Sequence, residues 1–109
     1  QDKVINACHK HNIIISCHVP LCRGKVLDDP MLNKIGKLHG KSAAQVALRW
    51  LVQQKNIAIV PRALEYSEIE ENMNIFDFQL TNSDMDNIST LREKNYRVVN
   101  PEVRRPVWD

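Results

Sequence analysis

The sequence has 109 residues, of which 43% are hydrophobic and 26% charged, as in an ordinary globular domain. Its formal net charge of +2 is small and spread along the chain, so nucleic acid is not predicted as a partner. Apolar runs such as Ile13–Ile15 are far shorter than the roughly 20 residues that span a bilayer, so no membrane association is expected. Three cysteines and the lack of a secretory signal pattern favour free thiols in a cytoplasmic protein.

The chain begins with a predicted helix, strand and loop. Residues 1–12 carry apolar side chains at helical spacing, which predicts an amphipathic helix. Ile13–Cys17 is an apolar run without alternation, typical of a strand buried on both faces of a parallel sheet. Pro20 ends this strand, and residues 21–25 predict an exposed loop. In α/β folds, ligands bind at loops in this position.

Two helices are predicted next. Asp29 before Pro30 is typical of an N-cap followed by a first-turn proline, and Gly40 ends this short helix. Ser42 and Gln45 then form a capping-box pattern, which predicts the start of a stronger helix that runs to about residue 54.

The second half of the chain repeats this order. Ile57–Val60 predicts another buried strand, which Pro61 ends. After a loop at residues 62–66, Ser67 and Glu70 predict a second capping box, and residues 81–84 predict the start of a further helix. Residues 96–109 contain two prolines and predict an extended tail beside the segment 1–95.

This order of elements predicts a piece of a larger α/β sheet. Two parallel strands alone leave unpaired backbone on both outer edges and apolar faces only partly covered, so further strands are expected from elsewhere. Because parallel strands end at the same edge of a sheet, the loops after residues 17 and 60 are predicted to emerge side by side.

Three groups of motifs occur along the chain. The first is Cys17–Gly24, in which a strand end is followed by a proline, a leucine and a glycine-bearing loop. The second is the helical segment His39–Trp50. The third and most specific consists of Val60–Ala63, then Glu71-Asn72, then Ile75–Leu80. In order and spacing, these motifs resemble the aldo-keto reductase family over nearly the whole chain. The tail, residues 96–101 and 107–109, is most similar to that of the bacterial 2,5-diketo-D-gluconate reductases.

The resemblance implies a (β/α)₈ TIM barrel, of which this chain would be the C-terminal part, with the last two strands and their flanking helices. It implies an oxidoreductase that uses NADPH to reduce small dicarbonyls, keto sugars or aldehydes to alcohols. The family's catalytic tyrosine, lysine, aspartate and histidine would lie upstream of Gln1. No catalytic residue is therefore assigned here, and the chain alone is expected to be inactive.

The same resemblance assigns cofactor contacts to the loops that follow both strands. His18 takes the place of an aromatic ring that stacks on the nicotinamide, although it also fits a polar residue that ends a strand. Leu21, Arg23 and Gly24 match the loop over the pyrophosphate, where a glycine permits a tight turn and a cation offsets phosphate charge. In the second loop, which begins at Pro61, Arg62 replaces a lysine beside the adenosine 2′-phosphate, and its guanidinium can bond that phosphate twice.

Two residues near the 2′-phosphate depart from the family pattern. Ala63 lacks the usual hydroxyl, and Glu68 stands where an arginine is common, so NADH remains possible beside the favoured NADPH. Glu71 and Asn72 match a pair that contacts adenine, and the alternative for them is a solvated helix face. Trp108 is predicted near the substrate opening, or else as an anchor that packs the tail onto the barrel.

Two other functions are considered. Six soft metal ligands fall within fifteen residues, which raises a zinc-binding module, although Cys17 lies in a predicted buried strand whose neighbouring side chains point to opposite faces. The six are Cys8, His9, His11, Cys17, His18 and Cys22. The chain could also be a non-catalytic fragment that completes its sheet by self-association or by docking to the missing N-terminal part of a barrel.

Overall fold

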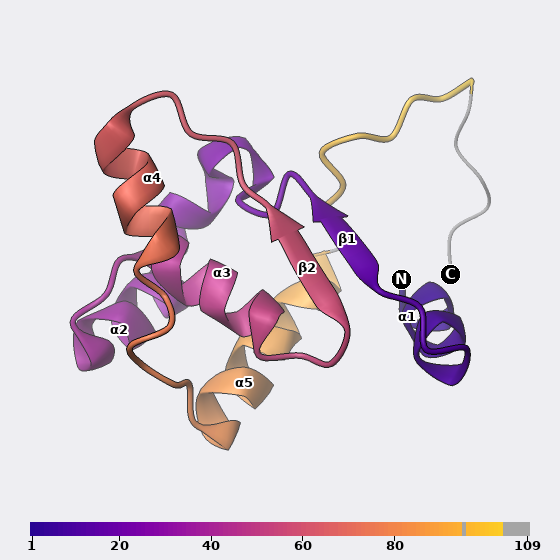
Figure 1. The fold of residues 1–109 in the computed structure, drawn as a ribbon, viewed down its shortest axis with the longest axis horizontal. Helices are drawn as coiled ribbons and strands as arrows, with labels where there is room; N and C mark the ends of the chain where they lie inside the picture. The colour runs from indigo at the N-terminus through magenta and orange to yellow at the C-terminus, as the bar shows by residue number, and fades with distance from the viewer. Residues whose placement is uncertain (95, 104–109) are drawn as a thin grey trace.

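The structure is a computed structural model that describes residues 1–94 and 96–103. Its strands are β1 (Ile15–His18) and β2 (Ile57–Val60), and its two 3-10 segments are η1 (Cys22–Asp28) and η2 (Thr90–Lys94). The helices are α1 (Asp2–Lys10), α2 (Pro30–His39), α3 (Ala43–Val52), α4 (Tyr66–Met73) and α5 (Asn82–Ser89) (Figure 1). The predicted order of helices and strands is therefore confirmed. Trp108 and the rest of residues 104–109 lie outside the described residues.

The two strands form one parallel sheet, as predicted. Ile15 lies opposite Ile57, and His18 lies opposite Val60, so both strands end at the same edge. Strand β1 starts two residues later than expected, because the Ile13 amide donates to the carbonyl of Cys8 at 2.8 Å and is still part of the turn after α1. At the opposite edge, the side chains of the residues that precede each strand, Asn12 and Asn56, share a hydrogen bond of 3.1 Å.

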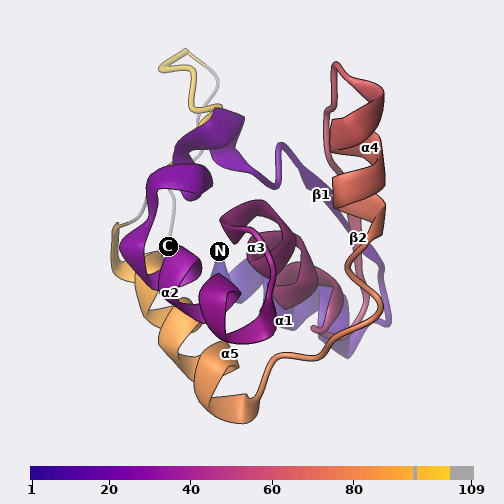
Figure 2. The ribbon, with the colours of Figure 1, turned by 90° about the vertical axis from the view of Figure 1, so that its left-hand side faces the viewer.

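Only one face of the sheet is covered. Side chains alternate between half-buried and exposed along both strands, and Val60 is 60% exposed, so the prediction of strands buried on both faces is wrong for this chain. Helix α3 contacts β2 and lies between the strands and α2 (Figure 2). The uncovered face carries Ser16, His18, Ala58 and Val60.

The apolar core lies among the helices. Buried side chains from α2, α3 and α5 pack together, and Val46 and Leu48 of α3 have no exposed surface. Helices α1 and α4, in contrast, bury none of their residues. No helix in the described ranges is long and apolar enough to cross a membrane. The core residues are Leu32, Ile35, Ala43, Val46, Ala47, Leu80 and Ile88.

Three of the predicted helix starts are confirmed. The Asp29 carboxylate accepts from the first turn of α2, and α3 and α5 begin with capping boxes at Ser42 and Thr81. Gly40 ends α2 with a φ of 65°, a left-handed conformation that glycine adopts without strain.

The predicted start of α4 is wrong. Its N-cap is Glu65, which pairs reciprocally with Glu68, so the helix begins before the expected Ser67. The predicted loop 21–25 also contains more structure than expected, because η1 runs through it and is interrupted at Arg23 and Gly24.

Candidate functional site

The edge of the sheet where both strands end brings together the two loops that the sequence singled out. His18 and Val60 are register partners, so the chain leaves the sheet at neighbouring points, at Val19 and Pro61. The side chain of His18 is exposed on the uncovered face of the sheet. A flat ligand could therefore reach the imidazole from that side.

The first loop turns sharply through left-handed backbone conformations. Val19, Cys22 and Arg23 have φ values of 56°, 50° and 54°, and Gly24 has a φ of 87°. The Cys22 amide donates to the Val19 carbonyl at 3.0 Å, and the Gly24 amide donates to the Leu21 carbonyl at 2.9 Å. Side chains in such conformations cost about 1–3 kcal/mol each, and they cluster at ligand-binding sites.

The second loop carries a cation, Arg62. The guanidinium of Arg62 is exposed and makes no hydrogen bond or ion pair with any other residue in the described ranges. Its neighbours Pro61 and Ala63 line a pocket of about 390 Å³ together with Asn72 of α4. The remaining walls are apolar and are formed by Ile59, Ile69, Met73, Ile75 and Phe76.

Glu68 is committed to the start of α4. Its carboxylate accepts hydrogen bonds from the amides of Leu64 at 2.7 Å and Glu65 at 3.3 Å. These two bonds lower the pKa of Glu68 below its usual range. The side chain is therefore an anion at neutral pH, fixed beside the loop that carries Arg62.

The two predicted adenine contacts differ in their surroundings. The carboxylate of Glu71 accepts a hydrogen bond from the hydroxyl of Ser42 and so points toward α3. The amide of Asn72 has no hydrogen-bond partner among the residues that the structure describes. Of the two, only Asn72 has a side chain free to bind a ligand.

Polar contacts between α3 and α4 were not predicted from the sequence. Gln45 is only 7% exposed, and its amide donates to the carbonyls of Glu71 and Asn74, both at 3.1 Å. Lys41 donates to the same Asn74 carbonyl at 3.1 Å and to the Asp77 carboxylate at 2.7 Å.

The cysteine and histidine residues near the N-terminus do not form a metal site in the described part of the chain, which includes all six of them. Burial raises the pKa of the thiols of Cys17 and Cys22. A raised pKa keeps a thiol protonated, whereas a metal ligand must be a thiolate.

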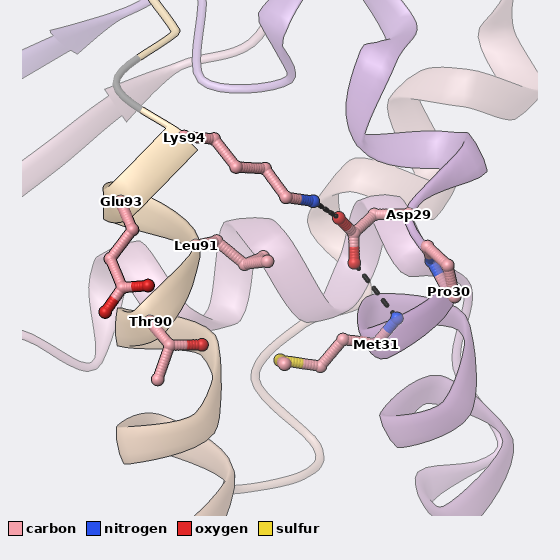
Figure 3. Close-up of a pocket in the computed structure, with 7 residues that line it drawn as sticks. All are labelled: Asp29, Pro30, Met31, Thr90, Leu91, Glu93 and Lys94. Atoms are coloured by element: carbon pink, nitrogen blue, oxygen red, sulfur yellow. Dashed lines mark hydrogen bonds and ion pairs between the residues drawn. The ribbon is translucent and has the colours of Figure 1, made fainter.

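A second pocket lies between the start of α2 and η2. It has a volume of about 430 Å³ and is lined by seven residues, which Figure 3 shows. The Asp29 carboxylate accepts from the Met31 amide at 3.0 Å and from the Lys94 ammonium at 2.7 Å, and Thr90 donates to the carbonyl of Asn87 at 2.7 Å. Because these polar groups are already paired, the pocket offers few of them to a ligand.

Comparison with known proteins decides the family. The sequence model of the aldo/keto reductase family matches residues 1–93. The chain belongs to the aldo/keto reductase family. Its structure is accordingly a partial α/β unit of the family's TIM barrel, and the predicted fold class is confirmed.

Individual aldo/keto reductases align with nearly all of the chain. A crystal structure assigned as a 2,5-diketo-D-gluconic acid reductase B is 40% identical, with a TM-score of 0.94, and is matched over 100% of this chain and 39% of that one. A mutant of Gox0644 in complex with NADPH is 31% identical, with a TM-score of 0.82, over 89% of this chain and 36% of that one. The NADP-dependent D-sorbitol-6-phosphate dehydrogenase of Malus domestica is 35% identical over 93% of this chain. The chain spans only 35% of that relative's length.

Proposed function

We propose that this chain supplies the cofactor-binding loops of an aldo/keto reductase that uses NADPH to reduce a carbonyl group to an alcohol. The observation that carries the proposal is the parallel pairing of β1 with β2, which starts both loops at one edge of the sheet. The two relatives whose names include NADP or NADPH support the same cofactor for this chain.

The residues at this edge fit a dinucleotide. His18 offers a flat, exposed ring for the nicotinamide, and the turn at Arg23 and Gly24 offers a cation and a close backbone approach for the pyrophosphate. Arg62 has no partner within the described chain and is available for the 2′-phosphate, and Asn72 offers both a donor and an acceptor to the adenine edge. When bound, the cofactor supplies the hydride, and the protein orients it.

The substrates that we propose are small dicarbonyls, keto sugars or aldehydes. Two relatives bear the names 2,5-diketo-D-gluconic acid reductase B and D-sorbitol-6-phosphate dehydrogenase, both of which denote sugar-derived compounds. We assign no catalytic residue to this chain. Assayed with NADPH and a panel of these carbonyls, the protein expressed from its complete gene should turn them over, and the 109-residue chain alone should not.

Arg62 provides the sharpest test of the cofactor assignment. A charge-assisted hydrogen bond contributes about 1.5–3 kcal/mol, and the exposure of Arg62 favours the lower end, so Arg62→Ala should weaken NADPH binding about tenfold. NADH lacks the 2′-phosphate, so its affinity should not change. The matched control is Arg92→Ala, which removes another exposed arginine, in η2, that faces Asp2 of α1. An unchanged ratio of NADPH to NADH affinity in Arg62→Ala would remove this role.

The uncovered sheet face favours a second possibility, a non-catalytic fragment that docks or self-associates. Within the described residues, each strand is paired on one side only. Exposed strand edges and an open sheet face favour association. Size-exclusion chromatography with light scattering tests it, because a monomer that melts cooperatively would contradict self-association.

A further inference from the structure

We propose that Gln45 is a positioning residue for the cofactor site, because its buried amide sets the position of Asn72 by holding the end of α4. The inference rests on the proposed function, since it concerns the adenosine side of the same site. NADPH is the ligand whose binding depends on Gln45.

The side-chain amide of Gln45 makes three hydrogen bonds, one within the cap of α3 and two to the end of α4. Its oxygen accepts from the Ser42 amide at 3.0 Å, which is part of the capping box of α3. Its nitrogen donates to the carbonyls of Glu71 and Asn74, both at 3.1 Å. The side chain is 7% exposed, so water cannot readily replace these bonds.

Helix α4 has little apolar packing to fix its position. None of its residues is buried, and the fully buried Ile75 follows the end of the helix. The last carbonyls of a helix lack regular partners within it. Gln45 shares the Glu71 carbonyl with the Asn74 amide and the Asn74 carbonyl with the Lys41 ammonium, and it is the buried donor that joins both to α3. The position of this helix end therefore depends on polar contacts with α3 more than on apolar packing.

Asn72 lies between the two carbonyls that Gln45 holds. Its neighbour Glu71 is anchored twice, through its carbonyl by Gln45 and through its carboxylate by Ser42. Asn72 itself lines the pocket beside Pro61 and Ala63. A shift of the helix end would move Asn72 relative to the loop that carries Arg62, and misplacement of about 1 Å is enough to weaken a bound ligand.

The residue after the end of α3 provides a matched control. Gln53 also bridges two segments: its side-chain amide donates to the Leu80 carbonyl at 2.8 Å and accepts from the Leu80 amide at 3.0 Å. Its side-chain oxygen also accepts from Arg49 of α3 at 3.0 Å, and none of these bonds reaches α4. Gln53→Met therefore removes comparable backbone contacts without releasing Asn72.

The experiment uses the protein expressed from its complete gene, with binding measured by isothermal titration calorimetry. The ligands are NADPH and reduced nicotinamide mononucleotide, which has no adenosine half. Gln45→Met should raise the Kd for NADPH about tenfold. The Kd for the mononucleotide, and kcat at saturating NADPH, should each change by less than about twofold. Gln53→Met should lower the Tm comparably and leave both Kd values unchanged.

Three results would overturn the proposal: an unchanged Kd for NADPH in Gln45→Met, an equal rise in Gln53→Met, or an equal loss of mononucleotide binding in Gln45→Met. If Gln45→Met does not fold, Ser42→Ala removes only the bond to the Glu71 carboxylate and the cap, and should raise the Kd for NADPH about threefold. No rise there would overturn the proposal as well. A wild-type protein that binds NADPH but reduces no carbonyl would contradict the proposed function and leave this binding test intact.

Discussion

Replacement of Gly36 by alanine tests how tightly α2 packs against the turn that leads into α3. Gly36 is buried in α2, and a Cβ atom there would lie 2.3 Å from the carbonyl oxygen of Lys41. Real Cβ contacts are never this short, and the obstacle is backbone, so a rotamer change cannot relieve it. The helix and the turn must move apart.

The expected magnitude follows from three effects. Alanine is favoured over glycine inside a helix by about 1 kcal/mol, which would stabilise the variant. Overpacking costs about 1–3 kcal/mol. The Gly36 carbonyl also accepts from the amides of Gly40 and Lys41, the latter at 2.8 Å, and disturbance of these bonds adds about 1 kcal/mol. The net loss in the free energy of unfolding is therefore about 2 kcal/mol.

Denaturant unfolding measures this loss as a lower midpoint with an unchanged m-value. The control is Gly40→Ala, where a Cβ would meet nothing within 4 Å but φ is 65°. That variant should lose about 1–2 kcal/mol from backbone strain alone. A Gly36→Ala protein as stable as the wild type would refute the steric argument.

Two further predictions concern carboxylates that join helices. Burial raises the pKa of Asp84, but hydrogen bonds from Thr81 and His39 outweigh this effect and hold the pKa below its usual range. The stability that Asp84 contributes is therefore present above about pH 4, and it is lost as the pH falls through the folded-state pKa. Unfolding measured from about pH 6 to about pH 2 should show this loss, and Asp84→Asn should lack it. Asp29→Ala should lower the free energy of unfolding by about 1–2 kcal/mol, because the carboxylate caps α2. Lys94→Met should lower it by less than about 1 kcal/mol, because the ammonium is largely exposed. Equal losses for the two variants in thermal denaturation would contradict this prediction.

Helix starts with a single local cap could be predicted from the sequence. Asp29, Ser42 and Thr81 each bond to amides two or three residues ahead, so the pattern that identifies them lies within one turn. The predicted start of α4 is wrong because two overlapping pairs compete: Ser67 with Glu70 fits the usual capping box, whereas the structure uses Glu65 with Glu68, and Glu is not among the preferred N-cap residues.

Contacts between distant segments could not be predicted in this way. Ser42 and Gln45 were identified as a capping box, yet their bonds to α4 join residues 26 to 29 positions apart. The burial of the strands was overstated for a similar reason, because an apolar run shows that a strand can be buried on both faces but not which elements cover it. The pairing of β1 with β2 was predictable because consecutive strands usually lie side by side, and strands joined by a helical connection pair in parallel.

The central claim is that the loops after β1 and β2 form one dinucleotide site, and a crystal structure of the complex with NADPH tests it most directly. The account predicts density that runs along the edge of the sheet, with the nicotinamide against His18 and the 2′-phosphate on the guanidinium of Arg62. Dinucleotide density elsewhere, or a bound NADPH that leaves Arg62 without a phosphate contact, would contradict it.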